Sequence, residues 1–192
     1  MGVPRLIHLF DVPQRFVAGT VGVPGERTFF LQAVDGQRVV SVALEKVQVA
    51  ALADKLLELL DEVRRRGVAG ATLVGSARLS GPDSGRVLED VGPLAAPVEE
   101  EFRVGTMALA WDGDEGMVVV EAMAQRAPGA AAAEPLTDAA EDGPDVLRVR
   151  LQPAQVRSFV RRAQRVVAAG RRPCYLCGLP LDPEGHRCPR LN

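Results

Sequence analysis

The sequence predicts an α+β protein made of two β-β-β-α repeats with antiparallel sheets related by pseudo-twofold symmetry, followed by a short cysteine-rich tail. Two observations support the repeats: a pattern of three strand-like segments occurs twice, and an amphipathic helical stretch follows each copy. The chain has 192 residues, of which 47% are hydrophobic, and its formal net charge is −2. This composition is sufficient for a core and excludes a disordered chain, which would have few apolar residues and a large net charge.

The strand-like segments of the two repeats correspond in residue type. The first segments share an aromatic start and a Gly-Thr end, the second share a polar residue before a final alanine, and the third share alternating apolar residues. The corresponding segments are 16–20 with 102–106, 29–33 with 118–122, and 40–44 with 147–151. The separation between corresponding positions only increases along the chain, as insertions in loops would cause.

Each repeat ends in a predicted helix. Between residues 47 and 63, apolar residues recur at spacings of three and four, which predicts one buried helix face. Arginines 64–66 then favour the carboxyl end of a helix, and Gly67 can provide a left-handed cap. The second helix is expected to begin at Pro153 and to end at Gly170, with its apolar stripe at positions 156, 159, 160, 163 and 167.

Two separate three-stranded sheets would have exposed edges and half-formed cores, so the repeats are expected to pack together. The predicted organisation is a first repeat at residues 1–67, a connecting segment at 68–98, a second repeat at 99–170 and a tail at 171–192. Asp35-Gly36 predicts a hairpin turn in the first repeat. In the second repeat, residues 126–144 replace that turn and are rich in alanine, proline and acidic residues, which predicts a flexible surface insert.

All three cysteines lie in the tail, at spacings that are typical of metal-binding sites. Cys174 and Cys177 form a Cys-x2-Cys pair, and after eight intervening residues His186 and Cys188 form a His-x-Cys pair. Three thiolates and one imidazole are a complete tetrahedral ligand set for structural zinc. The tail is too short to bury a core, so zinc binding would provide its folding free energy, on the order of 10–16 kcal/mol in zinc-finger peptides. The sequence therefore predicts a zinc knuckle at residues 171–192.

A redox pair and a chance cluster of cysteines are the alternatives to a metal site. A thioredoxin-like Cys-x2-Cys pair begins a helix after a strand, whereas this pair follows a predicted helix and lies among prolines. A catalytic zinc usually has three protein ligands and an open position for water. Four available ligands therefore favour a structural ion.

Basic residues are concentrated in the last part of the chain. Residues 145–192 contain 10 basic and 3 acidic side chains, whereas residues 81–144 contain 3 basic and 14 acidic ones. Four arginines of the second predicted helix are candidate phosphate or anion binders, and these are Arg157, Arg161, Arg162 and Arg165. The same residues are also explained as a solvated helix face that balances the acidic middle of the chain. RNA binding is possible but not favoured, because aromatic side chains that would stack on bases are scarce in this region.

No catalytic residue can be assigned from the sequence. A phosphate-binding Gly-x4-Gly-Lys-Ser/Thr loop, a Gly-x-Gly-x2-Gly motif and a Gly-x-Ser-x-Gly elbow are all missing. His186 is assigned to the metal, and His8 lies in a strand-like segment where a packed histidine is common. The sequence also has no apolar run of roughly 20 residues and no secretion signal, so a membrane role is not expected and a cytoplasmic location is.

Several phrases resemble a known family. Residues 16–22, 25–33 and 99–106, together with the tail from Cys174 to Pro189, resemble the actinobacterial repeat proteins catalogued as domain of unknown function 3090. The resemblance implies no established activity. It does imply a protein partner, since genes of the family tend to lie beside those of a phosphoglycerate-mutase-like protein and a phosphoinositide-kinase-like protein.

Two functions from different classes follow. The first is a cytoplasmic, non-enzymatic interaction or adaptor protein with a structural zinc. The second is an enzyme or regulator that acts on a phosphorylated small molecule, and RNA binding comes third. A cleft between the two repeats, lined by arginine and polar groups, would favour the second function. An exposed apolar patch would favour the first.

Overall fold

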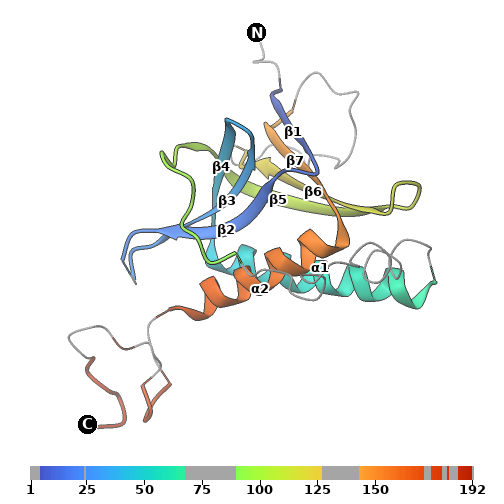
Figure 1. Ribbon diagram of the computed structural model, residues 1–192. Helices are drawn as coiled ribbons and strands as arrows, with labels where there is room; N and C mark the ends of the chain where they lie inside the picture. Colours follow the sequence, from blue (N-terminus) through green and yellow to red (C-terminus); the bar gives the residue numbers. More distant parts are fainter. Residues whose placement is uncertain are drawn as a thin grey trace.

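The computed structural model contains one curved β-sheet with two helices against one of its faces (Figure 1). It describes residues 5–23, 25–67, 90–126, 143–170, 174–178, 181 and 186–191. Most of the predicted insert at 126–144 and of the predicted connecting segment at 68–98 lies outside these residues. Within the described part of the chain, neither helix has the length and apolar character needed to cross a membrane.

The first half of the chain forms four strands and a helix. The elements are β1 (Ile7–Asp11), β2 (Arg15–Val21), β3 (Thr28–Asp35), β4 (Arg38–Leu44) and α1 (Lys46–Arg65). The second half forms three strands and a helix, which are β5 (Glu100–Asp112), β6 (Met117–Ala124), β7 (Val146–Leu151) and α2 (Pro153–Ala168). All six predicted strand segments lie within strands of the model, and both predicted helices are present. The additional strand is β1, which lies outside the predicted three-strand pattern.

The strands are arranged in the order β1-β7-β6-β5-β4-β3-β2. Within this sheet, β2-β3-β4 and β5-β6-β7 are antiparallel, as the sequence predicts, but β4 pairs with β5 and β1 pairs with β7 in parallel. The expectation of antiparallel sheets is therefore incomplete: the two antiparallel units join into one mixed sheet. The predicted pseudo-twofold symmetry between the halves stays a prediction.

In each half of the chain, a parallel pair is formed by the first part of a long extended segment, and the rest of that segment pairs with a different strand. The start of β5, at Glu100 and Arg103, pairs with β4, whereas the rest of β5 pairs with β6. In the first half, β1 pairs with β7 and β2 pairs with β3, and only residues 12–14 separate β1 from β2. Val12 makes the corner between them with a φ of 49°, and its N–H donates to the carbonyl oxygen of Arg150 at 3.0 Å. The two ends of the strand order are thus directly connected along the chain.

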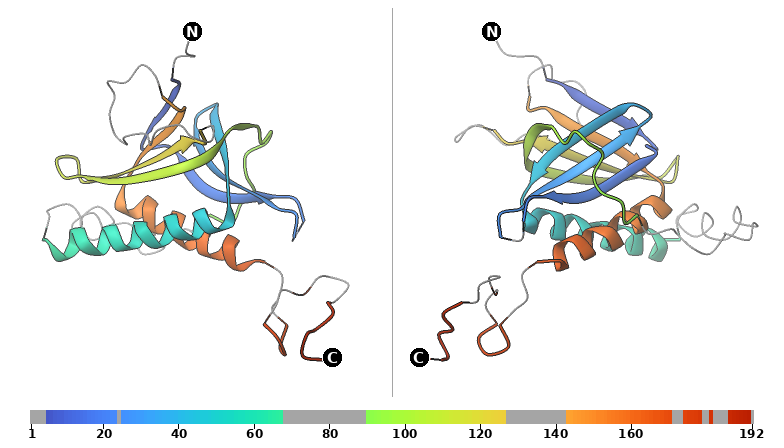
Figure 2. Two further views of the ribbon diagram at one scale, coloured as in Figure 1. Left: turned by 180° about the vertical axis from the view of Figure 1, so that it is seen from behind. Right: turned by 60° about the vertical axis from the view of Figure 1, so that its left-hand side comes forward.

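The core lies between the sheet and the helices. The helices pack side by side, and α2 also packs on β2 while α1 contacts β5 (Figure 2). The rings of Phe16 in β2 and Phe159 in α2 stack with their centroids 4.9 Å apart. The buried stripe of α1 consists of Val49, Leu52, Ala53, Leu56, Leu60 and Val63. It agrees with the predicted stripe except at Leu57, which is 37% exposed.

The opposite face of β2 and β3 is covered by the segment before β5, which is drawn in green in Figure 1. Leu94 lies directly on Gly19, where a Cβ atom would be only 2.5 Å from Cδ2 of Leu94. Any larger residue at position 19 would therefore force the side chain of Leu94 to move. The next residue, Ala95, is hydrogen-bonded to the buried side chain of Gln32 in β3.

Candidate metal centre

The four predicted ligands come together in the tail. Cys174, Cys177, His186 and Cys188 each direct one ligand atom to a common point, and these atoms all lie within 4.8 Å of one another. Sγ of Cys174 is 3.9 Å from Sγ of Cys188, and Sγ of Cys177 is 3.2 Å from Nε2 of His186. The Cys3His cluster could therefore hold one metal ion.

These distances fit a metal site and exclude a disulfide. None of the three cysteines forms a disulfide, which would hold its sulfur atoms about 2.05 Å apart. A tetrahedral zinc ion with bonds to sulfur of about 2.3 Å would hold two sulfur ligands about 3.8 Å apart. The separation of 3.9 Å between Cys174 and Cys188 is close to this value. The donor set and its spacing thus fit one tetrahedral ion.

A tight turn places the first two ligands. The N–H of Gly178 donates to the carbonyl oxygen of Cys174 at 2.8 Å, and Gly178 has a φ of 75°, which favours glycine. Inside this turn, the backbone N–H groups of Cys177 and Leu176 donate to Sγ of Cys174 and lower the pKa of that thiol. The turn therefore favours the thiolate, which is the form that binds metal. Pro180, Pro183 and Gly185, expected to shape the return of the chain, lie outside the described residues.

The second pair of ligands contains the only imidazole of the cluster. Nε2 of His186 faces the sulfur of Cys177, so this nitrogen is the candidate ligand atom. Its other ring nitrogen, Nδ1, is buried and has no hydrogen-bond partner among the described residues. The ring is thus oriented with one nitrogen toward the cluster and the other away from it.

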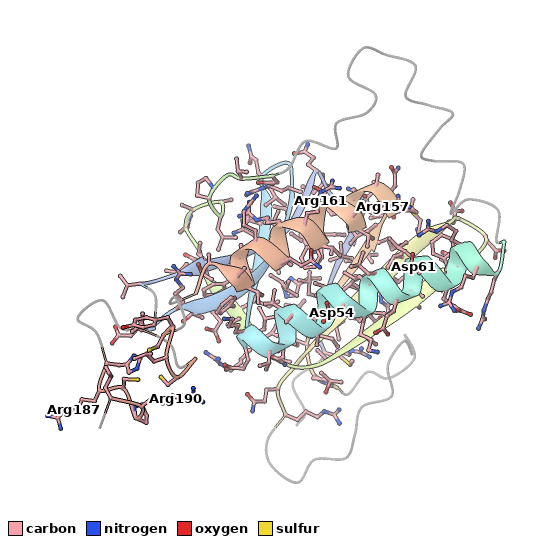
Figure 3. The ribbon with its side chains drawn as sticks, turned by 90° about the horizontal axis from the view of Figure 1, so that it is seen from below. Asp54, Asp61, Arg157, Arg161, Arg187 and Arg190 are labelled. Carbon is pink, nitrogen blue, oxygen red and sulfur yellow. The ribbon has the colours of Figure 1, made fainter. Side chains whose placement is uncertain are left out.

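The described residues of the tail lie beyond α2 and stand apart from the sheet in both views of Figure 2. Arg187 and Arg190 are exposed on its outside, as Figure 3 shows. The cluster is therefore separate from the sheet and from the helix layer that covers it.

Comparison with protein families gives one match. The model of the family described as "Protein of unknown function (DUF3090)" matches residues 8–188. The chain belongs to this family. No curated protein and no solved structure gives a significant match. The family match extends through Cys188 and so includes all four residues of the cluster.

The four arginines predicted to bind anions lie in different environments. Arg161 is exposed and Arg157 is half-buried, and both are labelled along α2 in Figure 3. Arg162 is only 4% exposed and turns toward the sheet, where its Nε donates to the carbonyl oxygen of Ala18 at 2.7 Å. Arg165 donates from Nη2 to the carbonyl oxygen of Asp90 at 2.8 Å. The model thus does not bring the four guanidinium groups to one surface.

Sequence reasoning missed the residue that joins these arginines. Asp90 accepts from Arg15 in a two-pronged pair at 2.5 and 2.9 Å and from Nη1 of Arg162 at 2.7 Å. The hydrogen bonds from Arg15 hold the pKa of Asp90 below its ordinary value, and burial lowers the pKa of Arg162. One signal was available, because Arg162 follows Phe159 by three residues and so lies on the buried face of α2. No local pattern indicates Asp90, which lies 75 residues from Arg15 in sequence.

Proposed function

We propose that the tail binds one structural zinc ion through Cys174, Cys177, His186 and Cys188, and that the protein is a cytoplasmic, non-enzymatic interaction module. The observation that carries the metal proposal is the convergence of four soft or borderline ligand atoms, with no cysteine of the cluster in a disulfide. Four protein ligands fill a tetrahedral site, so a bound zinc ion would stabilise the fold of the tail and would have no open position for substrate.

The interaction role is supported by an apolar groove between α1 and β5. The groove encloses about 520 Å³ and is lined by Val47, Gln48, Ala51, Leu52, Lys55, Gly105, Thr106, Met107 and Leu109. Beyond Arg103, β5 has β6 on one side and no strand on the other among the described residues. An unpaired strand edge beside an apolar groove accepts an extended peptide, whose backbone continues the sheet. The proposed occupant is an extended apolar segment of a protein partner.

We also propose that the two halves arose as repeats with pseudo-twofold symmetry. Both helices begin with the same reciprocal cap, in which the third helical residue, Gln48 or Gln155, accepts from the backbone N–H of the N-cap residue. The corresponding positions in β3 and β6 are both polar and fully buried, as Gln32 and Glu121. Their cross-strand neighbours, Ser41 and Arg148, are their hydrogen-bonding partners in both halves. These shared details are difficult to explain by packing alone.

The metal proposal is tested by native mass spectrometry of the full chain after zinc loading and desalting. The expected result is about one zinc per chain for the natural sequence and none for Cys177→Ser. Tyr175→Ser is the matched control, because Tyr175 is exposed, lies in the same turn and is not a ligand. Full zinc retention by Cys177→Ser, or equal loss in both variants, would contradict the proposal.

The interaction proposal is tested by photo-cross-linking in cell lysate. A photoreactive phenylalanine replaces Val47, which is 74% exposed at the groove, or Val23, which is 64% exposed outside it. Tandem mass spectrometry then identifies the peptide attached to each position. We expect one apolar segment at position 47 and none at position 23. The same peptides at both positions, or only polar peptides at position 47, would contradict the groove as the docking site.

A further inference from the structure

A second cavity lies between β2 and α2, at the junction of the two halves of the chain. It encloses about 220 Å³ and is lined by Gln14, Arg15, Phe16, Val17, Asp90, Gln155, Ser158, Phe159 and Arg162. Strand β2 belongs to the first half and α2 to the second, whereas Asp90 precedes β5. Polar side chains thus meet here from three separate parts of the chain, in contrast to the apolar groove beside α1.

The buried guanidinium group of Arg162 has donor capacity left at this cavity. Its Nε donates to Ala18, and its Nη1 donates to the carbonyl and carboxylate oxygens of Asp90. Its Nη2 makes no hydrogen bond to any described residue, although the residue is only 4% exposed. Nη2 is not fully buried, so water satisfies it in the free protein, and because arginine stays protonated this nitrogen remains available as a donor to a ligand. An oxygen-rich ligand in the cavity would provide the acceptor.

The charge around the cavity is positive. The lining contains two guanidinium groups, of Arg15 and Arg162, and both bond to its one carboxylate, that of Asp90, which leaves one positive charge in excess. Arg15 uses Nε and Nη2 in its bonds to the segment at Asp90, Gly92 and Pro93, and its Nη1 makes none to a described residue. The hydroxyl group of Ser158 adds a neutral donor to the lining. Two partly free guanidinium groups and a hydroxyl are the donors that a phosphate group requires.

We propose that this cavity binds the phosphate group of a small phosphorylated molecule, with Arg162, Arg15 and Ser158 as its ligands. The cavity of about 220 Å³ corresponds to the volume of roughly seven liquid water molecules, which is the size of a small phosphate monoester. Asp90 is then a positioning residue, because it aligns both guanidinium groups but would repel the anion. This site is independent of the zinc tail and of the apolar groove, and no reaction at the phosphate is implied.

Isothermal titration calorimetry with glycerol 3-phosphate tests the proposal on the full chain, in about 150 mM NaCl so that weak surface binding is screened. Glycerol is the uncharged comparison and inorganic phosphate the minimal probe. Gln14→Glu adds a carboxylate to the lining, whereas Gln164→Glu makes the same change on the exposed side of α2. We expect about tenfold weaker binding for Gln14→Glu and less than about twofold for Gln164→Glu.

A second measurement does not depend on any variant. In the natural protein, glycerol 3-phosphate should shift the amide NMR signal of Ser158 and the side-chain Nε–H signals of Arg15 and Arg162. The corresponding signals of Arg157 and Arg161, which do not line the cavity, should stay in place. No binding up to about 10 mM ligand would overturn the proposal, as would equal weakening by both glutamate variants or shifts confined to the exposed arginines.

Discussion

The side-chain amide of Gln32 forms two hydrogen bonds with the backbone of Ala95, which lies 63 residues later in the chain. Its Nε2 donates to the carbonyl oxygen of Ala95 at 3.0 Å, and its Oε1 accepts from the N–H of Ala95 at 2.7 Å. The same Nε2 also lies 3.0 Å from the hydroxyl oxygen of Ser41. A buried amide thus provides the donor and the acceptor that a neighbouring strand would otherwise provide, and it attaches the segment before β5 to the sheet.

Gln32→Glu should destabilise the protein by about 2 kcal/mol at pH 7, because the buried carboxylate cannot donate to the carbonyl oxygen of Ala95. Burial should raise the pKa of the new carboxyl group, so its protonation on acidification restores a donor. The deficit should therefore shrink as the pH falls from 7 toward 5. Urea unfolding at several pH values measures this, with the exposed Gln37→Glu as control. A deficit independent of pH would contradict the donor explanation.

The lowered pKa of Asp90 predicts that the folded state becomes less stable in acid. Its pKa is lowered from an ordinary value of 3.8, chiefly by the hydrogen bonds from Arg15, so the ionised form stabilises the folded state. This contribution is fully present above the ordinary value and is lost as the pH falls through the lower, folded-state pKa. Asp90→Asn should cost about 2 kcal/mol at neutral pH, less than a fully buried pair because Asp90 is 27% exposed.

The measurement is the free energy of unfolding of both proteins from pH 7 down to about pH 2. The natural protein and Asp90→Asn should differ most at neutral pH and converge only as the pH falls below 3.8 and through the lowered folded-state pKa of Asp90. If the free energies of unfolding of the two proteins differed by the same amount at every pH, the prediction would be contradicted, because the stabilising effect of Asp90 would not depend on its charge.

Loss of the metal ion is predicted to unfold the tail and to leave the rest of the protein folded. Because the Cys3His cluster stands apart from the sheet, removal of the proposed zinc ion with a strong chelator should expose residues 174–191 to protease while the body stays folded. Cys188→Ser should behave like the chelated natural protein. Limited proteolysis with mass spectrometry measures the cleavage sites, and calorimetry measures the melting of the body. A large fall in the melting temperature of the body would contradict the separation of the two parts.

The backbone conformation of Val12 predicts that a substitution at this position can stabilise the folded protein. A β-branched residue at a φ of 49° is strained, at a cost of about 1–2 kcal/mol, whereas asparagine tolerates this conformation. Val12→Asn should therefore stabilise the protein by about 1 kcal/mol and raise its melting temperature by about 3 °C. Val39→Asn, on a half-buried position within β4, is the control and should destabilise it. A lower melting temperature for Val12→Asn would show that the valine side chain contributes more than its strain costs.

Local patterns predicted most of the secondary structure and the metal cluster. Apolar stripes located both helices, and the four ligands lie close enough in sequence for spacing alone to indicate their convergence. The parallel pairs are different, since the paired residues Ile7 and Val146 are 139 positions apart, and nothing in the sequence of Ile7–Asp11 indicates which strand it pairs with. The Asp90 cluster was missed for the same reason, because its three side chains come from segments more than 70 residues apart.

The corner at residues 12–14 has a consequence for synthesis on the ribosome. Strand β1 leaves the ribosome first, but its partner β7 is among the last strands to emerge, and Ile7 must wait for Val146. The sheet therefore cannot be completed until β7 has been synthesised, and β1 has no partner strand among the described residues before then. Completion of the sheet thus depends on pairing between β1, which is synthesised early, and β7, which is synthesised late.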